Sequence, residues 1–125
     1  MPKSLRISIA DDEIDIRDFL ARVLPRLGHE VVSAAANGRE LVTDVLRLSP
    51  DLVITDVKMP ELDGLAAIEE FRRQREVPAI VISAHEEAAA TLSQQTSPTL
   101  FLTKPINSHR LQRAIGEIVA EAAAS

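Results

Sequence analysis

The 125-residue sequence contains no cysteine, no tryptophan and no tyrosine, and only three phenylalanines. Without cysteine, the chain can form neither a disulfide framework nor a thiolate metal site. With so few aromatic rings, it offers no stacking platform for single-stranded nucleic acid. No apolar run approaches the length of a membrane span, and the N-terminal segment lacks the apolar core of a signal peptide. We therefore expect a cytoplasmic protein that does not bind membranes.

Basic charge is also scarce, because 14 lysines and arginines face 19 aspartates and glutamates, for a net charge of −5. No long basic run occurs, so direct binding of nucleic acid by this chain is disfavoured. The length suits one domain with a real hydrophobic core, but not two. We therefore expect a single globular domain over residues 1–125.

Short apolar runs alternate with helical patterns along the whole chain. This alternation is typical of βαβ units and predicts a parallel sheet. Right-handed crossovers then favour an α/β fold, a doubly wound flavodoxin-like (βα)5 sandwich with strand order 2-1-3-4-5 and helices on both faces. The expected strands are 5–10, 30–35, 52–55, 79–82 and 99–103, and the expected helices are about 16–27, 39–48, 65–75, 86–95 and 108–122.

Two of these helices carry irregular signals. Pro25 lies in the last turn of the first helix, so we expect that helix to end a little early, before the natural stop at Gly28. The segment 86–95 has Leu92 as its only large apolar residue, which makes it the weakest helix prediction. Ser97 and Pro98 then break the chain before the last strand.

Polar residues stand where the apolar runs end. In an open parallel sheet, the carboxyl ends of the strands share one edge, where ligands bind. Three carboxylates, a hydroxyl and an ammonium would meet there and suit a divalent cation and a phosphoryl group. Hard oxygen ligands favour Mg²⁺, or Mn²⁺, over zinc. The residues are Asp11, Asp12, Asp56, Ser83 and Lys104.

Each of these residues also has an ordinary structural explanation. Asp11 and Asp12 suit the N-cap of a helix, and Asp56 suits the start of a loop. Ser83 could be a turn hydroxyl, and Lys104 a solvated surface lysine. The placement of all five at strand ends of one sheet edge favours a shared site.

Several motifs resemble those of a bacterial response-regulator receiver domain of the CheY-like family. They are ADDE at 10–13, PDLVITDVKMPELDG at 50–64, VISA at 81–84 and LFLTKP at 100–105. The resemblance covers nearly the whole chain. It implies a domain of two-component or phosphorelay signalling, with no output domain in this chain, whether as a stand-alone regulator or as a piece of a larger one.

The resemblance also implies the chemistry of the site. Asp56 would accept a phosphoryl group from a phosphohistidine on a sensor histidine kinase or a histidine phosphotransfer protein. Asp12 and Asp56 would ligate Mg²⁺ directly, joined by the backbone carbonyl of Lys58, and Asp11 would act mostly through a metal-bound water. The product would be an acyl phosphate, and we expect no classical multiple-turnover enzyme.

Further residues are assigned by the same resemblance. Lys104 would pair with the Asp56 carboxylate before transfer and with a phosphoryl oxygen after it. Ser83 would donate a hydrogen bond to another phosphoryl oxygen. Phe101 would turn inward as a switch, although simple core packing explains it equally well. A cis peptide bond is expected before Pro105.

Two side chains near the site are candidates for setting the lifetime of the acyl phosphate. They are Lys58 and His85, although a solvated loop histidine is an equally good explanation of His85. The segment from Ser83 to Lys104 is about one residue shorter than is usual. We therefore expect local distortion on the family's usual output surface, where a downstream protein or a weak homodimer would dock.

Three functions compete at this point. The first is an active phosphoacceptor, which the complete site favours. The second is a receiver that binds protein partners without phosphorylation. The third is a Mg²⁺-dependent phosphohydrolase, which commonly has a second acid two residues after the nucleophile. Here that position holds Lys58, and no insertion is long enough to form a cap.

Overall fold

Five parallel strands form the centre of the molecule, in the order β2-β1-β3-β4-β5. The computed structural model describes residues 4–84 and 98–124. This order and the doubly wound α/β architecture confirm the fold expected from the sequence. The strands are β1 (Arg6–Ala10), β2 (Glu30–Ala35), β3 (Leu52–Asp56), β4 (Ala79–Ser83) and β5 (Thr99–Thr103).

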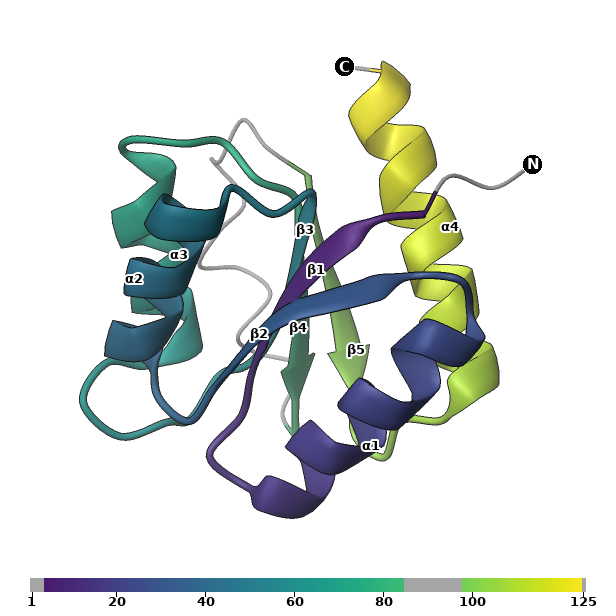
Figure 1. Cartoon of the computed structure of the whole chain (residues 1–125), viewed down its shortest axis with the longest axis horizontal. Coiled ribbons are helices and arrows are strands. Elements are labelled where there is room, and N and C mark those ends of the chain that lie inside the picture. Colours follow the sequence, from purple (N-terminus) through teal and green to yellow (C-terminus); the bar gives the residue numbers. More distant parts are fainter. Residues whose placement is uncertain (1–3, 85–97, 125) are drawn as a thin grey trace.

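Helices cover both faces of the sheet, as Figure 1 shows. Helices α1 and α4 lie on one face, and α2 and α3 lie on the other. The labelled helices are α1 (Ile14–Arg26), α2 (Gly38–Leu48), α3 (Gly64–Arg72) and α4 (Ser108–Ala124). The helix expected at 86–95 lies outside the described residues, and none of the helices within them is long and apolar enough to span a bilayer.

Two hydrophobic clusters hold these layers together. Successive residues of a strand point to opposite faces, so β3 sends Ile54 to one cluster and Val53 to the other. The cluster under α1 and α4 includes Leu20, Leu24, Leu111 and Ile115, and the cluster under α2 and α3 includes Leu41, Val45, Ile68 and Phe71.

The helix boundaries follow the signals in the sequence closely. Helix α1 ends at Arg26, directly after Pro25, and Gly28 adopts a left-handed backbone with φ of 95°. Helix α3 ends at Arg72, a few residues before the expected end near residue 75. There the amide of Gln74 bonds to the carbonyl of Phe71, which tightens the last turn.

Strand register brings the polar strand ends together. Ala10 pairs with Thr55, Asp56 pairs with Ile82, and Ser83 pairs with Thr103. The carboxyl ends of β1, β3, β4 and β5 therefore lie along the same side of the sheet. The polar side chains at these strand ends and just after them lie close together.

Candidate functional site

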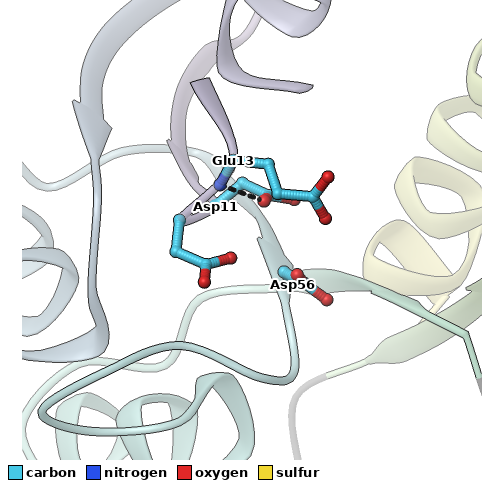
Figure 2. Close-up of side chains that lie close together, drawn as sticks. Asp11, Glu13 and Asp56 are labelled. Carbon is cyan, nitrogen blue, oxygen red and sulfur yellow. Dashed lines mark hydrogen bonds between the residues drawn. The ribbon is translucent and has the colours of Figure 1, made fainter. Parts of the chain in front are cut away.

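Four carboxylates gather at this edge of the sheet. One oxygen from each of Asp11, Asp12, Glu13 and Asp56 lies within 4.8 Å of the others. Asp11 and Asp56 are buried, whereas Asp12 and Glu13 are exposed. Figure 2 shows three of these side chains at the ends of β1 and β3. So many like charges in one place repel one another unless a cation lies among them.

Asp11 is the most deeply buried member of this cluster. Its Oδ1 accepts a hydrogen bond from the amide of Glu13 at 2.9 Å, while its Oδ2 is buried without a hydrogen-bond partner. The pKa of Asp11 is raised from 3.8 to about 6, mainly by burial and also by the nearby charge of Asp56, while the Glu13 amide and Lys104 lower it. The Glu13 amide and the Lys104 ammonium thus offset only part of the cost of burying this charge.

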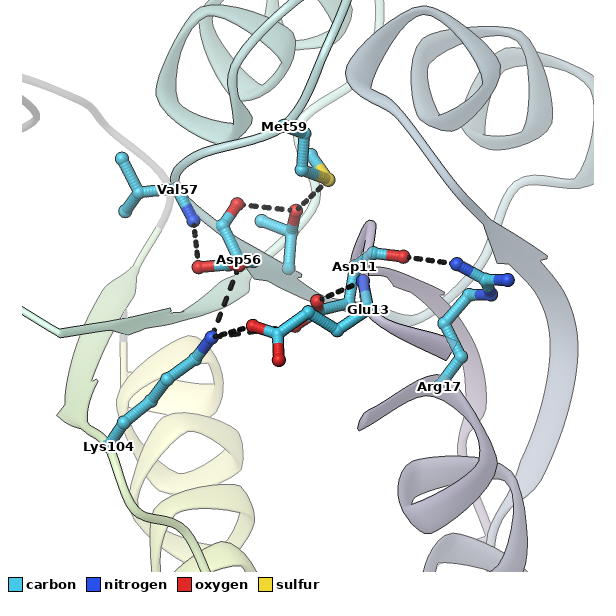
Figure 3. Close-up of polar contacts among 8 residues, drawn as sticks. Asp11, Glu13, Arg17, Asp56, Val57, Met59 and Lys104 are labelled. Carbon is cyan, nitrogen blue, oxygen red and sulfur yellow. Dashed lines mark hydrogen bonds and ion pairs between the residues drawn. The ribbon is translucent and has the colours of Figure 1, made fainter. Parts of the chain in front are cut away.

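The two oxygens of Asp56 have different partners. Oδ1 accepts a hydrogen bond from the amide of Val57 at 2.8 Å, and Oδ2 accepts one from Lys104 Nζ at 3.3 Å. The carboxylate is thus held in one orientation, with Oδ2 on the side of the ammonium, as Figure 3 shows. Thr55 donates its hydroxyl hydrogen to the Asp56 carbonyl at 2.9 Å.

Lys104 is the cation of the cluster. Its Nζ lies 3.3 Å from Asp56 Oδ2, 3.3 Å from Glu13 Oε1 and 4.0 Å from Asp11 Oδ2. Burial lowers the pKa of Lys104, but the carboxylates of Asp56 and Asp11 and its hydrogen bonds raise it by more, so the net pKa is raised. The peptide bond between Lys104 and Pro105 is cis, as predicted.

The loop between β3 and α3 passes beside the cluster and carries Lys58, whose side chain is exposed. The amide of Gly64 closes the loop by bonding to the Val57 carbonyl at 2.7 Å. Within this loop, the amide of Leu62 donates a hydrogen bond to the carbonyl of Pro60 at 2.8 Å. The residue between them, Glu61, has φ of 72°. This is a γ-turn, in which the central residue has a positive φ.

Ser83 and Phe101 lie beside the cluster in different ways. Ser83 is buried at the end of β4, and its carbonyl accepts the amide of Lys104 at 2.9 Å. Phe101 is half-buried in β5 and packs against the cluster under α2 and α3. This position is compatible with both explanations of Phe101, the switch and core packing. His85 lies outside the described residues.

Two residues at the site were not predicted from the sequence. Glu13 is part of the carboxylate cluster, and Arg17 Nη1 donates a hydrogen bond to the backbone carbonyl of Asp11 at 2.7 Å (Figure 3). Glu13 was visible as the last letter of the ADDE motif. Arg17 carried no signal, because only the folded start of α1 brings its guanidinium back to the loop.

The donor set fits a hard divalent cation. Every ligand atom in the cluster is a carboxylate oxygen, which suits Mg²⁺ or Mn²⁺ and not zinc. The buried Oδ2 of Asp11 accepts no hydrogen bond, and the Lys104 ammonium lies 4.0 Å away, so this oxygen can accept a further positive partner. The residues present therefore match the cation expected from the sequence.

Comparison with known proteins identifies the family. Residues 7–116 match the response regulator receiver domain family. The chain is 37% identical over 111 residues to the transcriptional regulatory protein PdtaR of Mycobacterium tuberculosis, across 88% of this chain and 54% of that protein. It is 36% identical over 104 residues to a protein-glutamate methylesterase/protein-glutamine glutaminase of Archaeoglobus fulgidus, across 81% of this chain and 30% of that protein.

Solved structures agree with this assignment. The response regulator domain of Thermotoga maritima CheB superposes with a TM-score of 0.79 at 25% identity, covering 98% of both chains. The receiver domain of Erythrobacter litoralis PhyR gives a TM-score of 0.81 at 28% identity, over 94% of this chain and 91% of that one. The chain belongs to the family of receiver domains of two-component response regulators. It spans about a quarter to a half of the length of the curated relatives.

Proposed function

We propose that Asp56 is the phosphoacceptor of this receiver domain. The observation that carries the proposal is the pairing of Asp56 Oδ2 with Lys104 Nζ at 3.3 Å, inside a cluster of four carboxylates. The phosphoryl donor is the phosphohistidine of a sensor histidine kinase or of a histidine phosphotransfer protein. Transfer changes the conformation of the domain and controls a downstream protein or an output domain.

The Asp56 carboxylate is oriented for nucleophilic attack. With Oδ1 held by the Val57 amide, Oδ2 forms the new bond to phosphorus. The bond from phosphorus to the donor histidine nitrogen breaks, and that nitrogen keeps the electron pair. In the loose transition state of phosphoryl transfer, positioning and electrostatics supply most of the catalysis.

A divalent cation completes the site. Asp12, Asp56 and the backbone carbonyl of Lys58 would hold Mg²⁺ or Mn²⁺, with Asp11 acting through a water. When bound, the cation offsets negative charge on the phosphoryl oxygens. Burial of Asp11 next to Asp56 supports this assignment, because two close carboxylates without a cation are costly.

The remaining site residues respond to the new phosphoryl group. Lys104 leaves the carboxylate for a phosphoryl oxygen, and Ser83 donates its hydroxyl hydrogen to another. Phe101, which is half-buried in this structure, then turns further inward. Lys58 and His85 control the access of water to the acyl phosphate. In this scheme the domain assists its own phosphorylation and dephosphorylation, without turning over other substrates.

Intact-mass spectrometry after incubation with acetyl phosphate tests the proposal. Wild type gains a single phosphoryl adduct with Mg²⁺ and none with EDTA. Asp56→Asn gains none, while Asp15→Asn, which alters an exposed residue of α1, labels like wild type. Beryllofluoride binding followed by NMR detects an activated site even when the adduct decays quickly. Failure of both measurements in wild type would favour a phosphorylation-independent binding module.

A further inference from the structure

Glu13 occupies the N-cap of α1, but its side chain does not cap the helix. Its backbone is extended, with φ of −90° and ψ of 118°, and its side chain makes no hydrogen bond to the first turn. The caps of α2 and α3 behave differently, because Asn37 accepts the amide of Glu40 and Asp63 accepts the amide of Ala66. The side chain of Glu13 is therefore not needed to start its helix.

The Glu13 side chain instead contacts Lys104, which directly follows β5. Its Oε1 lies 3.3 Å from Lys104 Nζ, the same distance that separates Nζ from Asp56 Oδ2. The side chains are 61%, 23% and 8% exposed for Glu13, Lys104 and Asp56, so the ion pair lies on the solvent side of the phosphoacceptor. Figure 3 shows the contact joining the loops after β1 and β5.

Glu13 also contributes a carboxylate oxygen to the four-acid cluster. The same carboxylates thus face two cations, the ammonium that the structure shows and the divalent ion that the proposed function requires. A charge shared by two competing cations affects both, because each cation gains Coulomb energy from it. Asp11 adds a separate observation, because its buried Oδ2 accepts no hydrogen bond and the Lys104 ammonium lies 4.0 Å away from it.

We propose that Glu13 is a further positioning residue of the site, which holds the Lys104 ammonium beside Asp56 and strengthens divalent-cation binding through its charge. This inference rests on the proposed function, since it assigns a role towards the same cation. It adds a residue to the site and explains why a glutamate stands at a helix position where shorter polar residues normally cap.

Glu13→Gln and Asp15→Asn form a matched pair for the test. Each removes one negative charge from the start of α1, and both residues are exposed. Only Glu13 contacts Lys104 and the cluster. Asp15 carries the same charge in the first turn of α1, so its variant controls for general charge and for the helix dipole.

The first readout is the Kd for Mg²⁺ from isothermal titration calorimetry, together with Tm. We expect Glu13→Gln to weaken Mg²⁺ binding about three- to tenfold with Tm unchanged, and Asp15→Asn to change Kd less than about twofold. The second readout is the NMR signal of the Lys104 side chain in EDTA. We expect the chemical shift of this signal to change in Glu13→Gln and to remain unchanged in Asp15→Asn.

Equal Kd values and equal Lys104 signals in the two variants overturn the inference. A fall in Tm specific to Glu13→Gln with an unchanged Kd for Mg²⁺ would also overturn it, because Glu13 would then contribute to stability alone. If wild type binds no Mg²⁺, the metal part of the proposed function fails and the inference fails with it. Wild-type binding with equal variants leaves the proposed function standing and removes only the role of Glu13.

Discussion

Gly64 lies directly against the backbone carbonyl of Asp56. A Cβ atom at Gly64 would come within 1.9 Å of that oxygen, and within 3.2 Å of the Thr55 hydroxyl. The amide of Gly64 also bonds to the Val57 carbonyl at 2.7 Å. The first residue of α3 thus packs on the backbone of the proposed phosphoacceptor, and only a residue without a side chain fits there.

Gly64→Ala should therefore destabilise the protein by more than about 2 kcal/mol, because the rigid backbone at Asp56 must move. Gly116→Ala is the matched control, since nothing lies within 4 Å of a Cβ at that position in α4. Replacing a helical glycine with alanine should stabilise the protein by up to about 1 kcal/mol. Urea denaturation measures both, and a Gly64→Ala protein as stable as Gly116→Ala would contradict the close approach.

Asp11 should make the metal-free protein less stable as the pH rises. Its folded pKa of about 6 lies above the ordinary 3.8, so between these values the folded state binds more protons than the unfolded state. Stability falls through this window, and the full cost above pH 6 is about 3 kcal/mol at most. Asp11→Asn should thus raise the free energy of unfolding at pH 7.5, and much less at pH 4.

Urea denaturation in EDTA at the two pH values checks this prediction. Asparagine keeps an Oδ1 that can accept the amide of Glu13, so the loop geometry is preserved. Asp15→Asn, on the exposed side of α1, should show no comparable difference between the two pH values. An Asp11→Asn protein that is less stable than wild type at pH 7.5 would refute the cost of burying this carboxylate.

In Lys104→Met, Mg²⁺ should raise Tm by more than it does in wild type. Without the ammonium, Asp56, Asp11 and Glu13 lose their cationic neighbour, and Tm should fall in EDTA. The divalent cation then has no competitor, so it should bind more tightly and raise Tm by a larger amount. Thermal denaturation with and without Mg²⁺ in both proteins measures the difference. Equal Mg²⁺-induced shifts would show that ammonium and metal do not compete.

Arg72 should stabilise the far edge of the sheet without affecting the site. It is buried at the end of α3 and donates to the carbonyls of Val77 and Pro98 and to the hydroxyl of Thr99. Burial lowers its pKa to about 10, so it remains charged at neutral pH. Arg72→Leu leaves these acceptors without a donor, and it should lower the free energy of unfolding by about 3 kcal/mol.

The Mg²⁺ affinity of Arg72→Leu shows whether the variant affects only the stability of the sheet or also the carboxylate cluster. Arg72 contacts the residues that precede β4 and β5, whereas the cluster follows the opposite ends of the strands. Calorimetry on folded Arg72→Leu should give a Kd for Mg²⁺ within about twofold of wild type. A large change in Kd would mean that the two edges of the sheet are coupled.

The strands, their order and the meeting of Asp11, Asp56, Ser83 and Lys104 at one edge were all predictable from residues 5–105. Alternating apolar runs and helical stripes are local patterns, since each depends on neighbours a few positions apart. In a parallel sheet, the ends of the strands then share an edge by topology alone. Even the stop of α1 near Gly28 follows from the backbone freedom of one residue.

Other features depend on distances between residues far apart in the chain. The sequence contains Glu13 and Lys104, but their 3.3 Å contact joins residues 91 positions apart and depends on how α1 and β5 pack against the sheet. The burial that raises the pKa of Asp11, and the reach of Arg17 to its carbonyl, have the same origin. Local patterns specify which elements form and where their polar ends lie, whereas packing specifies which side chains touch and how strongly water is excluded from them.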